Sequence, residues 1–247
     1  MELTVLGAGP AYTNQAGATG AAYLLRSGNG SILLDLGQGS FPALAASLEP
    51  STLDGIFISH LHPDHFIDLV ALRHYLRYEF DPPRRVNVHA PAELGQRIDA
   101  LHAEPGFTAA TLDVLPLGSG GQNVGPFRIE AGRVTHTSES YGFRVSAAGG
   151  SGLVYSGDCG DASDLEPLLR PGDTLLAEVS FGPGPVAPGA FHLDGPSVGR
   201  LAAAGGAGRV LLTHLQMGFD PVATVASVKA RFTGPVELVS PGFGTTI

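Results

Sequence analysis

The segment His60-Leu61-His62-Pro63-Asp64-His65 places three imidazoles and one carboxylate within six residues. Imidazole nitrogens and carboxylate oxygens are the ligands that zinc and similar divalent cations bind in proteins. The segment follows residues 53–59, a largely apolar run that predicts a buried strand. Because so many ligands gather at the end of one strand, the segment indicates a metal site, and we interpret the chain as a hydrolase that uses two metal ions.

Four further residues of the same ligand types stand at the ends of short, largely apolar segments: His136, Asp158, His192 and His214. Side chains that leave strand ends toward one crevice are the usual way in which an α/β scaffold builds a site. For any one of these histidines taken alone, a hydrogen-bonded structural role stays open. We expect structural roles for His89 and His102, which have no partners in the sequence, and a solvated helix face for His74.

The elements that must position these residues are short, since the chain contains 35 glycines and 19 prolines among 247 residues. The pattern predicts strands over residues 3–6, 21–26, 31–36, 53–59, 85–89, 112–114, 127–131, 141–145, 153–156, 174–179, 210–213 and 236–239. It predicts helices over residues 41–48, 67–78, 93–101, 196–204 and 222–231. Strand, loop and helix recur in both halves, which favours packed sheets with helices outside. Residues 118–126 and 182–189 predict loops, the second a flap before His192.

The formal net charge of −9 argues against a general surface for nucleic acid, which is held mainly by lysine and arginine contacts to phosphate. The clearest basic concentration contains Arg73 and Arg77, four positions apart on one predicted helix, with Arg84 and Arg85 nearby. We expect Arg73 and Arg77 to lie on a solvated helix face, and a contact to substrate phosphate is the alternative.

Cys159 is the single cysteine, so no disulfide forms within the chain, and the composition fits a reducing cytoplasm. No basic segment followed by an apolar stretch marks the first residues as a signal peptide. No run approaches the roughly 18 apolar residues that span a bilayer. We therefore expect a cytoplasmic protein without a membrane partner.

In order and spacing, these residues resemble the metallo-β-lactamase superfamily of hydrolases. The match runs through His60-x-His62-x-Asp64-His65, then His136, then Ser156-Gly157-Asp158, then His214. Such an ordered set is far more specific than a single His-x-His pair. The resemblance implies an α/β fold, the αβ/βα four-layer sandwich with two central mixed β-sheets and helices on both outer faces, formed by residues 1–247 as one domain.

The resemblance also implies two divalent metal ions, zinc in the first place and manganese as the alternative. One would be bound by His60, His62 and His136, the other by Asp64, His65 and His214, and Asp158 would bridge them. Two cations roughly 3.5–4 Å apart can share a hydroxide and lower the pKa of their water to about 7. His62 stands where redox-active di-iron members carry a carboxylate, so that function is not expected.

Within the superfamily the chain looks most like the ribonuclease Z-like phosphodiesterase branch, through Thr135-His136-x4-Tyr141-Gly142-Phe143-Arg144 and Ala190-Phe191-His192. The resemblance makes His192 a candidate general acid for the leaving oxygen, with a ligand-orienting role as the alternative. Asp64 is a candidate to orient the attacking water. Glu178, after Leu175-Leu176-Ala177, is a candidate to hold His192 or a ligand, against a simple charge at a strand end.

One departure from that branch concerns the substrate. Asp158 comes only 22 positions after His136, where the tRNA-processing members carry a long basic arm. Short relatives without the arm include proteins similar to cyclic-nucleotide phosphodiesterases. We therefore expect a zinc phosphodiesterase that acts on cyclic nucleotides or small phosphodiesters. RNA cleavage at tRNA 3′ ends, thioester or lactone hydrolysis and a non-catalytic metal-binding module are the alternatives, and the resemblance is compatible with a homodimer.

Other enzyme classes find less support in the sequence. Gly7-Ala8-Gly9 lacks the third glycine of a dinucleotide-binding turn and is followed by Pro10, so we expect a loop near the site instead. No Gly-x-Ser-x-Gly elbow of a serine hydrolase occurs. Cys159 is expected to line the turn that carries Asp158 rather than to act as a nucleophile.

Overall fold

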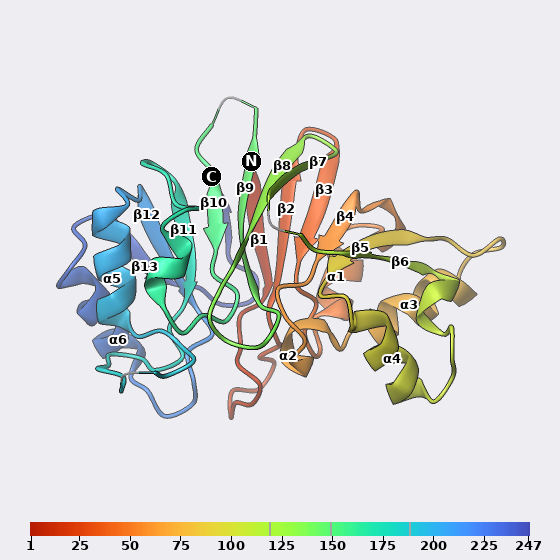
Figure 1. Cartoon of the computed structure of the whole chain (residues 1–247), viewed down its shortest axis with the longest axis horizontal. Coiled ribbons are helices and arrows are strands. Elements are labelled where there is room, and N and C mark those ends of the chain that lie inside the picture. Colours follow the sequence, from red (N-terminus) through yellow and green to blue (C-terminus); the bar gives the residue numbers. More distant parts are fainter. Residues whose placement is uncertain (119, 149, 188) are drawn as a thin grey trace.

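The computed structural model describes residues 1–118, 120–148, 150–187 and 189–247. Two seven-stranded β-sheets form the centre of the molecule, and helices lie outside them (Figure 1). The predicted fold class, an α/β sandwich of two mixed sheets, is confirmed. None of the helices in the described ranges is long and apolar enough to cross a bilayer.

The N-terminal sheet has the strand order β14-β1-β2-β3-β4-β5-β6. Its strands are β1 (Glu2–Gly7), β2 (Ala22–Ser27), β3 (Gly30–Leu34), β4 (Gly55–Phe57), β5 (Val86–Ala90), β6 (Leu112–Pro116) and β14 (Gly244–Thr246). Pairing is antiparallel from β14 to β3 and parallel from β3 to β6. The helices of this half are α1 (Phe41–Ser47), α2 (Pro63–Phe66), α3 (Leu69–Tyr78) and α4 (Leu94–His102), with 3-10 helices at Pro50–Thr52 and Thr108–Ala110.

The C-terminal sheet has the order β13-β12-β11-β10-β9-β8-β7. Its strands are β7 (Gly120–Val124), β8 (Phe127–Arg133), β9 (Tyr141–Ala147), β10 (Leu153–Tyr155), β11 (Thr174–Glu178), β12 (Arg209–Thr213) and β13 (Val236–Leu238). Strands β7 to β10 pair antiparallel, and β10 to β13 pair parallel. Outside lie α5 (Gly195–Ala204) and α6 (Pro221–Lys229), and a 3-10 helix spans Ala162–Leu165.

Three apolar layers hold this arrangement together. Between the sheets, Tyr23 and Phe57 of the N-terminal sheet pack with Phe143 and Tyr155 of the C-terminal sheet, and all four side chains are buried. One outer layer joins the N-terminal sheet to α1, α3 and α4, and the other joins the C-terminal sheet to α5 and α6. Because burying one such aromatic side chain contributes about 1.5–3 kcal/mol, the central layer fixes how the two sheets face each other.

The predicted strands and helices are present, with ends shifted by a few residues. Among the described residues, two strands, one short α-helix and the 3-10 helices were not predicted. Strand β7 lies in the glycine-rich stretch 118–126 that predicts a loop, whose residue 119 is outside the described ranges. It forms because Gly120–Val124 pairs along β8, with Gly125 in the left-handed region at the turn. Helix α2 lies inside the histidine segment, and β14 exists by pairing with β1.

The predicted solvated face of α3 is wrong for Arg73. Its side chain is buried, its Nε donates to the Phe107 carbonyl at 2.9 Å, and its guanidinium lies 3.7 Å from the centre of the Phe107 ring. Arg73 therefore fastens α3 to the segment before β6, while Arg77 is exposed. His102 also stacks on Phe107, as a structural role requires, and His74 is half-buried beside it rather than solvated.

Candidate metal centre

The candidate ligands gather at one edge of both sheets because each follows the end of a strand. The segment 60–65 comes after β4 of the N-terminal sheet, and His136 comes after β8. Asp158 and His214 follow β10 and β12, which run parallel, so both strands end at the same edge. Facing sheets thus bring together side chains that are far apart in the chain, such as Asp64 and His214, which are 150 positions apart.

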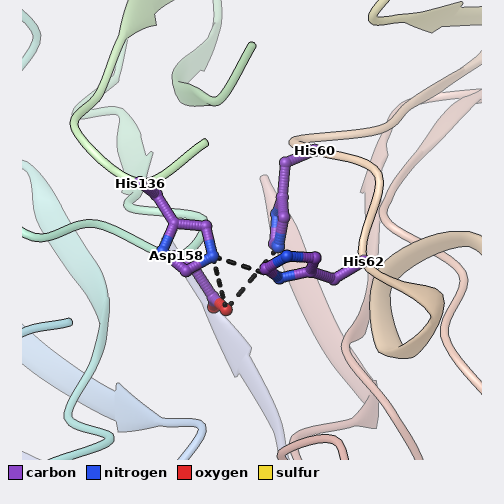
Figure 2. Close-up of side chains that lie close together, drawn as sticks. All are labelled: His60, His62, His136 and Asp158. Carbon is purple, nitrogen blue, oxygen red and sulfur yellow. Dashed lines mark hydrogen bonds and ion pairs between the residues drawn. The ribbon is translucent and has the colours of Figure 1, made fainter. Parts of the chain in front are cut away.

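A first group contains His60, His62, His136 and Asp158 (Figure 2). The Nε2 atom of His136 lies 3.1 Å from Nδ1 of His62. The Nε2 atoms of His60 and His136 each lie 3.6 Å from Oδ2 of Asp158. One ligand atom from each of the four side chains lies within 4.8 Å of the others, which is a spacing that one metal ion could fill.

A second group contains Asp64, His65 and His214. Nε2 of His214 lies 3.2 Å from Nε2 of His65 and 3.2 Å from Oδ2 of Asp64. The other oxygen of Asp158, Oδ1, lies 3.3 Å from Nε2 of His65 and 3.5 Å from Nε2 of His214. Asp158 therefore stands between the two groups and presents one oxygen to each.

Two side-chain atoms that face the centre of the site have no hydrogen-bond partner among the described residues. Nε2 of His60 and Oδ1 of Asp158 are buried without a hydrogen-bond partner in the described part of the chain. Buried polar atoms are almost always paired, so two orphans in one place need an explanation. Converging nitrogen lone pairs and carboxylate oxygens are satisfied together by cations, and we find that these residues fit two metal ions.

The outer nitrogen of each of four histidines is held by a second residue. Nδ1 of His65 lies 2.8 Å from Asp35 Oδ2, and Nδ1 of His136 lies 2.7 Å from the Phe191 carbonyl. Nδ1 of His60 and of His214 face the hydroxyls of Ser59, at 3.1 Å, and Ser180, at 3.0 Å. A proton held on Nδ1 leaves the Nε2 lone pair free for a metal.

Two of these supporting residues, Asp35 and Ser180, were not identified from the sequence. The Asp35 carboxylate is fully buried and also accepts from Ser59 N, Ser59 Oγ and Tyr155 OH, each at 2.7 Å. Its backbone is in the left-handed region, with φ of 57°. A carboxylate directly after the apolar strand β3 is the signal that could have revealed Asp35; a single Ser180 carries no such signal.

The electrostatics of the site favour added positive charge. Burial and the neighbouring His65 lower the pKa of His60 well below its usual value, so His60 is neutral and ready to bind a metal. Burial would raise the pKa of Asp158, but His214 and His65 outweigh it and hold that pKa well below its usual range. Burial would lower the pKa of His65, but Asp158 and Asp35 raise it well above normal. Without a cation, a proton on His65 thus partly replaces the missing positive charge.

His192 and Glu178 lie beside these two groups. Nδ1 of His192 is 2.9 Å from Oε1 of Glu178 and 3.8 Å from Oδ2 of Asp158. The buried Glu178 also accepts hydrogen bonds from the backbone N–H groups of Cys159 and Ser180. Burial would lower the pKa of His192, but the hydrogen bond and the charge of Glu178, together with the charge of Asp158, outweigh it, and the net shift is upward.

The remaining expectations about the site can be compared with the structure. Cys159 is buried in the turn after Asp158, and burial raises the pKa of its thiol, so it is a poor nucleophile. The loop after β1 touches the site, as expected, because the His214 N–H donates to the Ala8 carbonyl at 2.9 Å. His89 is buried and stacks on Phe57 away from the two groups. Pro188 of the predicted flap lies outside the described residues.

Comparisons with known proteins show which family the chain is similar to. A family model described as Beta-lactamase superfamily domain matches residues 32–215. An uncharacterised protein of Mycobacterium leprae is 33% identical over 252 residues, which cover 98% of this chain and 87% of the relative. The probable metallo-hydrolase YhfI of Bacillus subtilis is 27% identical over 248 residues, which cover 98% of each chain.

Solved structures show the same fold. The crystal structure of YhfI matches with a TM-score of 0.86 at 23% identity and covers 99% of both chains. The short form of human tRNase Z matches with a TM-score of 0.76 at 22% identity, covering 100% of this chain and 99% of that one. A diphosphatase of the PhnP family also reaches 0.76, at 17% identity, covering 100% and 97%.

Replacing Asp158 by alanine should remove metal from both groups, because its two oxygens face one group each. We expect the purified Asp158→Ala protein to contain at most a small fraction of the metal bound by the wild type, as measured by elemental analysis. Asp113→Ala, in an exposed ion pair with Arg85, is the matched control and should load normally. Normal metal content in Asp158→Ala would refute the bridging position.

Replacing Ser180 by alanine should weaken the second group alone. The hydroxyl accepts from Nδ1 of His214 while donating to the His214 carbonyl, and loss of such a support typically costs about 10–100-fold in metal affinity. Competition with a chelator measures this, and we expect one of two metals to bind more weakly. Ser146→Ala on β9 is the control; identical affinities in the two variants would contradict the supporting role.

Proposed function

The chain belongs to the beta-lactamase superfamily of metallo-hydrolases, and from this we propose that it is a zinc phosphodiesterase with two metal ions that hydrolyses cyclic nucleotides or other small phosphodiesters. The observation that carries the proposal is the position of Asp158. One of its oxygens faces His60 and the other faces His65, with His192 3.8 Å away. A site for two cations with an adjacent imidazole is suited to diester hydrolysis.

In this proposal the side chains divide between two metals. His60, His62 and His136 would hold the first, Asp64, His65 and His214 the second, and Asp158 both. When bound, the two cations supply positive charge at the phosphoryl oxygens and lower the pKa of a water to about 7. Imidazole-rich sites suit zinc, and manganese is the alternative because Asp64 and Asp158 supply carboxylate oxygens.

Residues of the chain itself would donate the proton to the leaving oxygen and orient the attacking water. Glu178 accepts the Nδ1–H of His192, which leaves Nε2 as the atom that gives a proton to the leaving oxygen. The contact with Glu178 raises the pKa of His192, which favours the protonated form. An alkoxide leaves poorly unless it is protonated, so this proton transfer limits the rate when the leaving oxygen belongs to a sugar hydroxyl. Asp64, beside His214, would orient the attacking water.

Several observations support a small substrate rather than tRNA. Between His136 and Asp158 the described chain forms β9, which pairs antiparallel with β10, so the connection is a hairpin. The net charge is −9. Of the described residues lining the pockets beside His62, His192 and His214, Arg97 and Arg200 are the cationic ones. A long polyanion would need many more such contacts.

A substrate panel tests the proposal directly. The zinc-loaded protein is offered cyclic mononucleotides, bis-p-nitrophenyl phosphate, a tRNA precursor, a lactone and a thioester. We expect turnover of the first two, and the fold likeness to a tRNase Z and a diphosphatase supports a phosphate ester over the last two. Selective cleavage of the tRNA precursor, or of the lactone or thioester, would replace the proposal, and no turnover at all would point to a metal-binding module.

The acid role of His192 predicts a dependence on the leaving group. His192→Ala should keep its metal but slow the hydrolysis of diesters with alkyl leaving groups about 10²-fold or more, because these need a proton. Release of p-nitrophenolate, which needs no proton, should fall much less. His102→Ala, far from the site, is the control. Equal losses for both leaving groups would argue against an acid.

The contact with Glu178 predicts the pH profile of the same reaction. A raised pKa means that protonated His192 is present below that pKa and is lost as pH rises through it, so activity on alkyl diesters should fall on the alkaline side. Glu178→Gln should move this fall to lower pH, because the group that raises the pKa is gone. Glu237→Gln, exposed on β13, should leave the profile unchanged. An unchanged pH profile in Glu178→Gln would contradict the assignment of His192 as the acid.

A further inference from the structure

A pocket of about 420 Å³ opens beside His214, between the loop that follows β1 and the loop that follows β12. Both loops lie at the lower edge of the molecule in the view of Figure 1. The hydrogen bond from the His214 N–H to the Ala8 carbonyl connects the two loops. Residues 238–241, at and beyond the end of β13, complete the wall. The size is within the range of small-molecule sites, about 300–1,000 Å³.

The described lining of this pocket is uncharged. It contains no lysine, arginine, aspartate or glutamate among the residues described, and its one ionisable side chain is His214 itself. Apolar side chains such as Leu215, Leu238 and Phe219 form part of the wall. The exposed fraction of Phe219 is 36%, so its ring is accessible to a ligand.

Amide side chains also line this pocket. Asn14 and Gln15 come from the loop after β1, and Gln216 comes from the loop after β12. None of the three amide groups makes a hydrogen bond to another residue within the described ranges, and Asn14 and Gln15 are exposed. Each amide offers both donors and an acceptor. The pocket thus combines apolar surface with unused neutral hydrogen-bonding groups.

The neutral lining and the free amide groups indicate which part of a substrate would fit this pocket. A second phosphate would meet no cation in the described lining, and an acyl chain would leave the amides unused. A nucleobase has apolar faces that stack on aromatic rings and an edge of donors and acceptors that asparagine and glutamine pair with. An uncharged heterocycle therefore matches the pocket best.

The pocket is placed correctly for such a base. The rings of His192 and His214 lie 6.1 Å apart and nearly parallel, with planes inclined by 20°. On the His192 side a different pocket, of about 510 Å³, carries the charged residues Asp161, Glu166, Asp194 and Arg200. The pocket beside His214 and the pocket beside His192 have no lining residue in common, so a base held beside His214 leaves His192 free to reach the leaving oxygen.

We infer that the pocket beside His214 is a base pocket, which holds the nucleobase of a nucleotide whose phosphodiester lies next to Asp158, beside His214 and His192. The inference rests on the proposed function and narrows it from small phosphodiesters to nucleoside phosphodiesters. Gln216 and Asn14 are the specificity-determining residues, because their amides read the edge of the base.

Nucleoside binding tests the base pocket without any turnover. Adenosine, guanosine, cytidine and uridine, which carry no phosphate to hydrolyse, are titrated into the metal-loaded protein by calorimetry, with ribose for comparison. We expect at least one nucleoside to bind and ribose to show no binding. Gln216→Ala and Asn14→Ala should each weaken that binding about 10-fold, the typical effect of losing a good hydrogen bond to a base. Gln96→Ala, exposed on α4, is the matched control and should bind like the wild type.

The kinetic counterpart is the ratio of kcat/KM for a cyclic nucleotide to that for bis-p-nitrophenyl phosphate, which should fall about 10-fold in Gln216→Ala. Metal content and thermal unfolding show that each variant is folded. Binding of no nucleoside, or wild-type binding in both amide variants, would overturn the base pocket even if diesters are hydrolysed. Nucleoside binding without hydrolysis of any diester would instead remove the phosphodiesterase proposal and keep the base pocket.

Discussion

The buried carboxylate of Asp158 is the group on which the rest of the site depends. Its side chain is 2% exposed and lies among imidazoles from both sheets, with one oxygen lacking a hydrogen-bond partner among the described residues. A buried charge is costly unless opposite charge compensates it. His60 stays neutral and cannot provide that compensation, whereas His65 provides part of it because Asp158 and Asp35 raise its pKa. A bound cation would supply further positive charge at this position and so stabilise the buried carboxylate.

The two sheets must keep a fixed position for Asp158 to reach both groups of histidines. Apolar packing sets their separation, and two polar contacts between the sheets set their position next to the site. Tyr155 of β10 donates to Asp35 after β3 at 2.7 Å, and Tyr23 of β2 bonds to Thr213 of β12 at 2.6 Å. Both contacts are buried and lie one or a few residues from a candidate ligand. A metal centre supported in this way is organised before the metal binds.

The sequence predicted site residues whose role follows from their neighbours in the chain. It did not predict residues whose role depends on contacts with distant segments. His60 to His65 and the strand-end positions of Asp158 and His214 could be recognised because ligand residue types follow apolar runs. Ser180 could not, and Asp35 was overlooked although it directly follows the apolar strand β3; each is a single polar residue whose role depends on a histidine 30 or more positions away. Arg73 was misplaced for the same reason: helical spacing does not reveal Phe107, which lies 34 positions later. Strand β7 likewise depends on pairing with β8, because its own glycine-rich sequence does not favour a strand.

Anomalous diffraction at the zinc edge from crystals of the zinc-loaded protein would locate the metals without reference to any substrate. We expect two peaks, one on either side of Asp158: the first within bonding distance of His60, His62 and His136, the second of Asp64, His65 and His214. A single peak elsewhere on the surface, or none at this edge of the sheets, would contradict a two-metal centre.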